Sequence, residues 1–122
     1  HEIADLIAQR PCFLVVETEG KTVGFASYDQ FRGGIGYAHA MEHTIILAPE
    51  ASGRGAGREL MRALMDHARA AAVHTLWAGV SAENSAGVAF HSALGFKTVA
   101  VLPEVGRKFE RWMDLVLMQK RL

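Results

Sequence analysis

A glycine- and arginine-rich loop stands in the middle of the chain, between a β-branched apolar run and an amphipathic segment. It reads Gly53-Arg54-Gly55-Ala56-Gly57-Arg58. Glycines allow successive backbone N–H groups to turn toward one anion, and the positive end of a following helix strengthens the attraction. The two arginines add mobile positive charge. These features together predict a phosphate-binding site at residues 53–58.

The loop matches neither of two familiar phosphate-binding motifs. A Walker A loop requires Gly-Lys-Ser/Thr, but here Gly57 is followed by Arg58 and Glu59. A dinucleotide-binding fingerprint counted from Gly53 and Gly55 needs a third glycine at position 58, which is arginine. A flexible loop that only caps a helix is the remaining alternative.

Residues 39–43 read HAMEH and match the inverted zinc-protease signature. On a helix the two histidines would share one face and could hold zinc. A glycine-rich loop precedes them, and an apolar run ending at Pro49 follows, which favours a strand instead. On a strand the histidines point to one face and Glu42 to the other. No third ligand is evident, so we predict no metal site.

Three further side chains are candidates for chemistry. Glu42 stands directly before the phosphate-binding stretch, where a carboxylate suits a base or an anchor for an ammonium group. A solvent-facing or ion-paired glutamate is an equally good interpretation. Asn84 and His91 lie two helical turns apart, which places an amide and an imidazole on nearly one helix face. A capping asparagine and a surface histidine are the alternative.

Periodicity and turn signals predict the elements that position these residues. Strands are expected at residues 12–18, 21–28, 39–47, 74–80, 97–102 and 111–119, and helices at 1–9, 56–72 and 85–93. In the second helix Leu60, Leu64 and Ala68 form one apolar row. Residues 29–37 and 103–110 are expected to be loops. The pattern is mixed α/β, with antiparallel hairpins followed by a strand–helix–strand–helix–strand core.

Composition narrows the classes of protein. The chain has 122 residues, enough for one domain, and 13 Lys and Arg balance 13 Asp and Glu. This balance argues against a nucleic-acid or anionic-membrane partner. The single cysteine, Cys12, excludes an internal disulfide framework. No apolar run is long enough to span a bilayer and no signal-peptide pattern opens the sequence, so we expect a cytoplasmic protein.

Two segments carry a family resemblance. SGRGAGRELM and NSAGVAFHSALGF resemble the GNAT superfamily of acyl-CoA N-acyltransferases, whose patterns are Gln/Arg-x-x-Gly-x-Gly/Ala and Asn-x6-Tyr/His-x3-Gly-Phe. Within it the chain is similar to the phosphinothricin and methionine sulfoximine/sulfone acetyltransferase family, most specifically in EVGRKFERWMDLVLMQ at residues 104–119. The likeness extends over roughly the whole chain, although the family's first strand and helix are absent from it.

The resemblance implies one GNAT domain over residues 1–122, N-terminally incomplete, with a mostly antiparallel mixed sheet flanked by helices. It implies acetyl transfer from acetyl-CoA to the primary amine of a small amino-acid-like substrate, by direct attack in a ternary complex, without a metal. It also implies a homodimer. A non-catalytic CoA-binding or sensory domain is the alternative function, and a dimerisation module is another.

The resemblance also assigns roles to residues. The backbone of Ile45, Ile46 and Leu47 would pair with the pantetheine arm, which needs a sheet edge opened beside the strand at 74–80. Gly53, Arg54, Gly55, Ala56, Gly57 and Arg58 would hold the pyrophosphate, and Asn84 would bind near the thioester. Glu42 would bind and deprotonate the amine, His91 would protonate the leaving thiolate, and the Leu47 amide would meet the carbonyl charge.

On the acceptor side, Phe31 and Arg32 fall in the family's substrate-recognition loop, where a guanidinium suits a carboxylate or phosphinate. Lys108, Phe109 and Trp112 could close the pocket, with a dimer interface as one way to do so; ordinary core or interface packing is the alternative for Trp112. The chain departs from the family pattern at two positions. Ser52 replaces the usual Gln or Arg of the phosphate loop, and Glu110 stands where relatives often have glycine.

Overall fold

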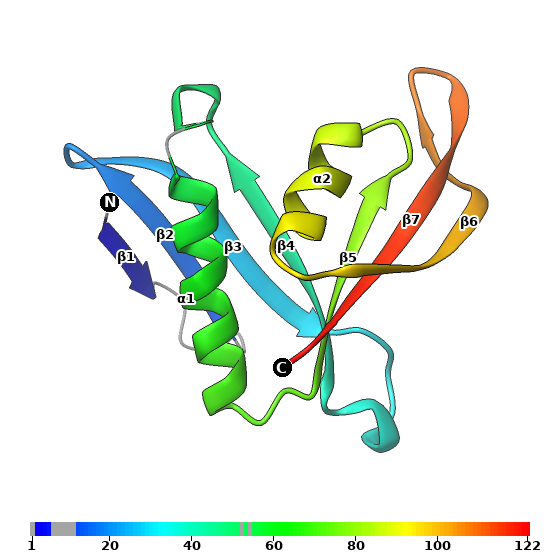
Figure 1. Cartoon of the computed structure of the whole chain (residues 1–122), viewed down its shortest axis with the longest axis horizontal. Helices are drawn as coiled ribbons and strands as arrows, with labels where there is room; N and C mark the ends of the chain where they lie inside the picture. The colour runs from blue at the N-terminus through cyan, green and yellow to red at the C-terminus, as the bar shows by residue number, and fades with distance from the viewer. Residues whose placement is uncertain (1, 6–11, 52, 54) are drawn as a thin grey trace.

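One seven-stranded sheet, in the order β1-β2-β3-β4-β5-β7-β6, organises the computed structural model (Figure 1). The structure describes residues 2–5, 12–51, 53 and 55–122. The strands are β1 (Glu2–Asp5), β2 (Cys12–Thr18), β3 (Lys21–Gln30), β4 (Ala40–Leu47), β5 (Thr75–Ser81), β6 (Lys97–Lys108) and β7 (Arg111–Arg121). The helices are α1 (Ala56–Ala70) and α2 (Ser85–Ala93), with short 3₁₀ turns at Ile35–Tyr37 and Pro49–Ala51. The predicted mixed, mostly antiparallel sheet is confirmed, because only the β4–β5 pair is parallel.

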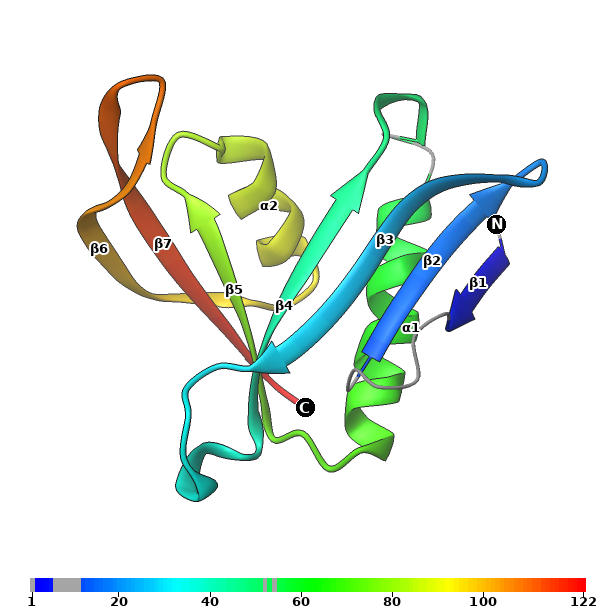
Figure 2. The ribbon, with the colours of Figure 1, turned by 180° about the vertical axis from the view of Figure 1, so that it is seen from behind.

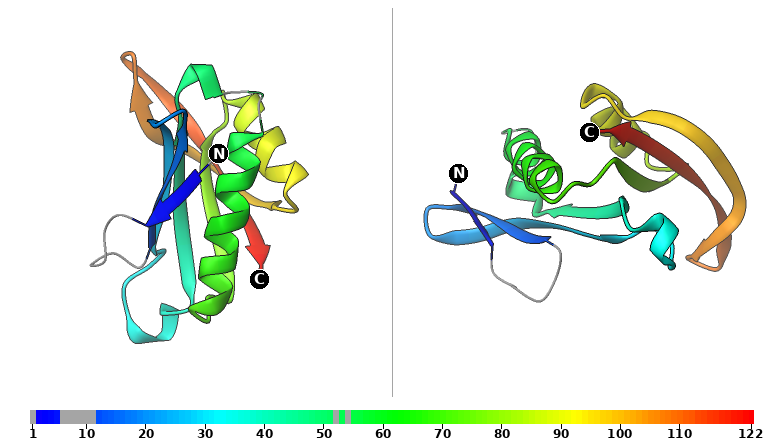
Figure 3. Two further views of the ribbon diagram at one scale, coloured as in Figure 1. Left: turned by 90° about the vertical axis from the view of Figure 1, so that its left-hand side faces the viewer. Right: turned by 90° about the horizontal axis from the view of Figure 1, so that it is seen from below.

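Both helices lie on the same side of the sheet (Figure 3). Helix α1 packs on β2 and β3, and its predicted apolar row of Leu60, Leu64 and Ala68 is fully buried. Burial of such a row is the main source of stability for a 15-residue helix. No helix within the described ranges is long and apolar enough to cross a membrane.

The sheet opens between β4 and β5. These strands pair from Ala40↔Thr75 to His43↔Ala78, and no pair follows, although both strands continue. Figure 2 shows the two strands diverging like the arms of a V, and in Figure 1 α2 stands between the arms. The opened sheet edge that the sequence analysis required beside β5 is therefore present.

The prediction of a helix at residues 1–9 is wrong for Glu2–Asp5, which form β1 antiparallel to β2 with Ile3 opposite Val16. The remainder of that predicted helix lies outside the described residues. Helical spacing in so short a segment is a weak signal, and the unpaired backbone edge of β2 offers hydrogen bonds that favour a strand.

The predicted loop at 103–110 is mostly strand. β6 continues to Lys108, and an irregularity between Leu102 and Gly106 absorbs the extra residues before pairing with β7 resumes. Only Phe109 and Glu110 remain as the hairpin turn, with φ angles of 53° and 60°. Positive φ at both turn residues matches the twist of the strands and favours Asn-Gly over larger side chains.

We therefore expect Glu110→Gly to raise the free energy of unfolding by up to about 1 kcal/mol, since a side chain in the left-handed region is strained. Chemical denaturation measures the change. As a control in the same hairpin, Lys97→Gly lies within a strand and should lower stability by about 0.5–1 kcal/mol. A loss of stability in Glu110→Gly would contradict the strain argument.

Candidate functional site

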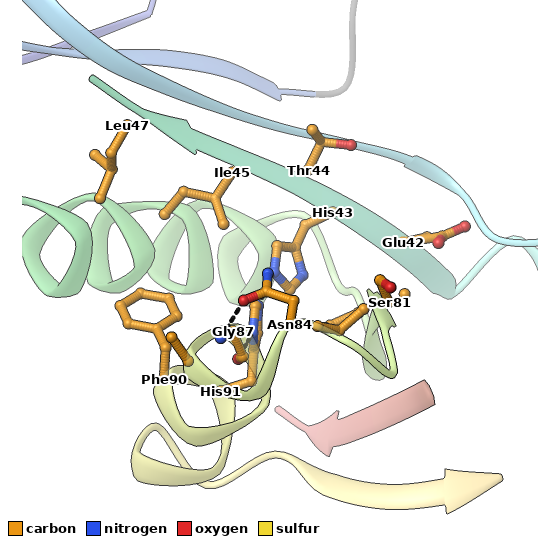
Figure 4. Close-up of a pocket in the computed structure, with 14 residues that line it drawn as sticks. Glu42, His43, Thr44, Ile45, Leu47, Ser81, Asn84, Gly87, Phe90 and His91 are labelled. Carbon is orange, nitrogen blue, oxygen red and sulfur yellow. Dashed lines mark hydrogen bonds between the residues drawn. The ribbon is translucent and has the colours of Figure 1, made fainter. Parts of the chain in front are cut away.

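A cavity of about 490 Å³ occupies the opening between β4, β5 and α2 (Figure 4). Five of the predicted site residues line it: Glu42, Ile45, Leu47, Asn84 and His91. His43, Gly79, Ser81 and Gly87 also line it and had not been predicted. Figure 4 shows the side chains of β4 alternating, with those of Ile45 and Leu47 directed toward α2 and that of Thr44 directed away.

The direction of the β4 backbone groups follows from hydrogen bonds at its beginning. The carbonyl of His39 accepts from the backbone N–H of His74 at 2.8 Å, on the β5 side. The carbonyl of Ala40 accepts from the N–H of Phe31 at 2.9 Å, on the β3 side. Backbone groups of successive strand residues point to alternate sides, so odd-numbered residues of β4 face β5 and even-numbered residues face β3.

Past His43, the odd-numbered residues Ile45 and Leu47 therefore present backbone N–H and C=O groups to the opening. Ile46 presents its backbone to β3, opposite Phe25, and its side chain is exposed. The geometry thus supports two of the three predicted strand contacts, and it does not support Ile46.

The phosphate loop ends in a helix start that has no side-chain cap. Gly55 is the N-cap of α1 with φ 81°, and Gly53 has φ 78°, both in the region that favours glycine. Gly57 serves close packing instead, because a Cβ there would lie 2.8 Å from Cδ1 of Leu47. The N-terminal turn of α1, whose N-cap Gly55 makes no side-chain hydrogen bond, and the exposed Arg58 fit a phosphate. Arg54 and Ser52 lie outside the described residues.

Glu42 stands over a gap left by a glycine. A Cβ on Gly79 would lie 2.9 Å from Oε2 of Glu42, so any side chain at position 79 would displace the carboxylate. Burial raises the pKa of Glu42 above its usual value, because an apolar environment disfavours the charged form. A carboxylate with a raised pKa is well suited to accept a proton near neutral pH.

Asn84 is the N-cap of α2, as the alternative interpretation of this residue in the sequence analysis expected. Its Oδ1 accepts a hydrogen bond from the backbone N–H of Gly87 at 2.9 Å (Figure 4). The residue lines the cavity as well, so the cap fixes the amide at the cavity wall.

His91 is buried, contrary to the surface alternative, and it contacts a second buried histidine. Its Nε2 lies 2.9 Å from Nε2 of His43, and its Nδ1 lies 2.8 Å from the carbonyl oxygen of Gly87. His43 and His91 are 5% and 6% exposed. One signal for His43 was present in the sequence: on a strand it alternates with Glu42 and therefore points to the opposite face.

Burial lowers the pKa of His43 to about 3, with a further lowering from the nearby His91 and an opposing contribution from the Trp77 backbone. Burial also lowers the pKa of His91, against an opposing hydrogen bond to the Gly87 backbone. Both imidazoles are consequently neutral at pH 7.

His39 is the other histidine of the zinc-protease signature. Its Nδ1 lies 2.9 Å from the carbonyl oxygen of Ala72, whereas His43 contacts His91 on α2, so the two histidines of the signature have different partners. Within the described ranges no group of three or more His, Cys, Asp or Glu side chains is placed to hold a metal ion.

The predicted substrate loop is held by its own contacts. Phe31 stacks on Trp77 with ring centroids 4.7 Å apart, and the guanidinium of Arg32 lies 5.5 Å from the ring centroid of Tyr37. Nε2 of Gln30 donates to the carbonyls of Arg32 and Gly34 at 2.7 and 2.8 Å. Phe31 and Arg32 do not line the cavity, but Trp77 is the register neighbour of Glu42.

The side chains predicted to close the pocket lie on the β6–β7 hairpin. Phe109 and Trp112 are 75% and 56% exposed, with Lys108 over the first ring and Arg107 over the second. None of them lines the cavity of its own chain.

Comparison with known proteins assigns the family. The model of the acetyltransferase (GNAT) family matches residues 1–96, and the chain belongs to this family. The L-amino acid N-acyltransferase MnaT of Escherichia coli is 40% identical over 109 residues, which are 89% of this chain and 63% of that protein. A methionine sulfoximine/sulfone acetyltransferase of Salmonella typhimurium is 39% identical, with 89% and 64% covered. The chain thus spans less than two-thirds of the length of these relatives.

A phosphinothricin N-acetyltransferase of Alcaligenes faecalis is 38% identical over 90% of this chain and 56% of its own length. Among solved structures, a Brucella melitensis protein described as a ribosomal-protein-alanine N-acetyltransferase has a TM-score of 0.87 at 45% identity, with 91% of this chain and 68% of its own covered. A Salmonella typhimurium acetyltransferase solved with its cofactor acetyl-CoA has a TM-score of 0.86 at 39% identity, with 91% and 64% covered. The resemblance seen in the sequence is confirmed.

The lowered pKa of His43 predicts how stability depends on pH. The unfolded chain binds a proton below about pH 6.5 that folded His43 does not bind until about pH 3. The free energy of unfolding should therefore fall as pH decreases through this window, by at most about 1.4 kcal/mol per pH unit for one such group.

Denaturation at several pH values tests this prediction. His43→Gln should flatten the slope between pH 6 and 4, whereas His74→Gln, at an exposed position outside the cavity, serves as the control. An unchanged slope in His43→Gln would show that His43 titrates alike in both states.

Proposed function

We propose that the protein transfers an acetyl group from acetyl-CoA to the primary amine of a small amino-acid-like substrate, by direct attack within a ternary complex. The observation that carries this proposal is the cavity at the β4–β5 opening, which is lined by the partly buried carboxylate of Glu42 and by Ile45 and Leu47 of the diverging strand. The start of α1 does not line this cavity but packs against its wall, since a Cβ on Gly57 would lie 2.8 Å from Leu47 and 3.2 Å from Phe90. The relatives named for methionine sulfoximine, phosphinothricin and amino-acid acylation support the substrate class.

The proposed path of acetyl-CoA runs from the start of α1 along β4 to the cavity. The pyrophosphate would meet the N–H groups at the start of α1, around Gly55 and Ala56, with Arg58 and Arg54 adding charge. The pantetheine arm would take the place of a neighbouring strand beside Ile45 and Leu47, whose backbone groups face the opening. Asn84 would bind close to the thioester. Acetyl-CoA supplies the activated acetyl group; the protein supplies position and proton transfer.

Glu42 is the residue we propose as the base and the anchor of the substrate ammonium. It accepts a proton from the amine, directly or through water, and the amine then attacks the thioester carbonyl. The N–H of Leu47 faces the opening and is the proposed donor to the charge that develops on the carbonyl oxygen. Gly79 keeps the carboxylate at the cavity.

His91 is proposed to stand beside the leaving thiol, at the cavity wall that α2 provides. The sequence suggested a proton donor there. Both ring nitrogens of His91 are already engaged, by Gly87 and by His43, and this constraint decides how the residue contributes.

Acceptor recognition is proposed for the loop of Phe31 and Arg32, with Arg32 binding the carboxylate or phosphinate of the substrate. We also propose a homodimer that covers the exposed Phe109 and Trp112 of the hairpin, and a cytoplasmic location. A non-catalytic CoA-binding domain has no need of a base at Glu42. Thiol release from acetyl-CoA with methionine sulfoximine or phosphinothricin, but not without an amine, supports the enzyme; CoA binding without turnover for any amine overturns it.

Glu42→Gln should lower turnover by about 10²-fold, because the amide cannot accept the proton. The wild-type rate should fall as pH decreases through the raised pKa of Glu42, since only the carboxylate acts as base. Glu50→Gln is the control, because Glu50 is exposed, lies outside the cavity and forms an ion pair with Lys21 at 3.4 Å. A change confined to the KM of the amine would make Glu42 an ammonium anchor without acid–base work.

Gly55→Asp should abolish CoA binding, because a carboxylate would meet the pyrophosphate at the start of α1. Isothermal titration with CoA measures the affinity. Gly20→Asp is a matched control, because Gly20 has φ 75°, open space around it and a position in the β2–β3 turn, outside residues 53–58. Equal CoA affinity in the two variants would refute the phosphate role of the loop.

A further inference from the structure

We propose that His43 is a positioning residue: by donating its Nε2–H to His91 it engages the second ring nitrogen and holds His91 as a fixed wall of the cavity, not as a proton donor. The proposal deepens the proposed function and rests on it only for its kinetic consequence. Its structural part can be tested without any acetyl transfer.

The positions of the hydrogens follow from the partners. The carbonyl of Gly87 can only accept, so Nδ1 of His91, 2.8 Å away, carries a hydrogen. In neutral His91 the Nε2 atom is then a bare acceptor. Its 2.9 Å contact with Nε2 of His43 is a hydrogen bond only if His43 supplies the proton. The pair therefore has one consistent neutral arrangement.

That arrangement leaves Nδ1 of His43 without a proton and, among the described residues, without a hydrogen-bond partner. The Trp77 backbone raises the pKa of His43. It could hydrogen-bond to Nδ1 of His43 only if Nδ1 carried a proton. A buried acceptor without a partner is unfavourable for folding. A side chain kept in this state at the wall of a cavity points to a role in the site.

Among the described residues, no ion pair involving His43 or His91 is present. The two rings contact each other and the rings of Phe90 and Phe96. On β5 the neighbouring Ala78 is apolar, and Glu42, the titratable group that shares the cavity, belongs to the opposite face of β4. A proton added to Nε2 of His91 would break its contact with His43 unless the hydrogen of His43 moved from Nε2 to Nδ1.

The location of the pair explains what it positions. His43 belongs to the last β4–β5 pair, opposite Ala78, where the two strands part. His91 joins it to α2, and the same ring holds the carbonyl of Gly87, whose N–H is bound by the Asn84 cap. One chain of hydrogen bonds thus runs from β4 at the opening to the amide that we propose near the thioester.

The reaction closes without a proton from His91. The amine nitrogen forms its bond to the carbonyl carbon, and the C–S bond breaks with its electron pair on sulfur. Glu42 takes one of the two protons that the ammonium loses, and the second passes to solvent water. The thiolate leaves as an anion and takes a proton from solvent according to pH, which a thiol tolerates near neutrality.

Imidazole nitrogen NMR on the ¹⁵N-labelled full chain tests the arrangement, with the two rings assigned from His43→Gln and His91→Gln. We expect a protonated Nδ1 and a bare Nε2 in His91, the reverse in His43, and no titration of His91 between pH 5.5 and 8. In His43→Leu, Nε2 of His91 loses its hydrogen-bond donor, so its nitrogen resonance should move toward that of a free, unprotonated imidazole nitrogen. A protonated Nε2 in wild-type His91, or an unchanged Nε2 resonance in His43→Leu, would overturn the proposal.

Kinetics give the second readout. His43→Leu should lower kcat about 10-fold or more, and His43→Gln, whose amide can donate to Nε2 of His91, should restore most of it. His74→Leu is the control at an exposed position outside the cavity. The wild-type rate should show no decrease from pH 7 to 9 of the kind a titrating acid produces. Equal kcat in His43→Leu and wild type, or such a decrease that vanishes in His91→Gln, would refute the positioning role.

Failure of this proposal and failure of the proposed function give different results. Absence of thiol release with every amine refutes the acetyltransferase and leaves the NMR result intact. An active enzyme with a freely titrating His91 refutes the positioning role and leaves the acetyltransferase intact.

Discussion

The end of the β4–β5 ladder at His43↔Ala78 is the constraint on which the site depends. Two parallel strands that stay paired leave no room for a ligand, and two that never pair cannot hold side chains in register. Here four pairs fix the register of Glu42 and His43, and the divergence that follows exposes the backbone of Ile45 and Leu47. The cavity and α2 lie beside the diverging parts of the two strands, and the start of α1 packs on Leu47 at the far end of β4.

Local signals in the sequence were enough for the main elements. Paired turn residues at Glu19 and Gly20, the apolar row of α1 and the Asn84 cap each act over a few residues, so the sequence predicts their structure directly. β1 could not be predicted, because its partner edge on β2 is a tertiary feature. The extension of β6 was missed because pairing with β7 absorbs Pro103–Val105, which look like a break when taken alone.

The site shows the same difference between local sequence signals and contacts that only the folded chain makes. The loop of Gly53 and Gly55 and the candidates Glu42 and His91 were visible as residue types at suggestive spacing. The contact of His43 with His91 joins residues 48 positions apart, and the room that Gly79 leaves for Glu42 exists only between neighbouring strands. The backbone groups of Ile46 face β3 and not the opening. This direction can likewise be known only from the hydrogen-bond partners of β4.

The order of the strands also bears on how the chain is made. β7 comes last in the sequence but lies between β5 and β6, paired with both. During synthesis β5 must wait with one bare edge until residues 111–121 emerge, and β6 has no partner at all before then. The half of the sheet that carries the far wall of the cavity is therefore completed only after residues 111–121 have been made, whereas β2, β3 and α1 can assemble earlier.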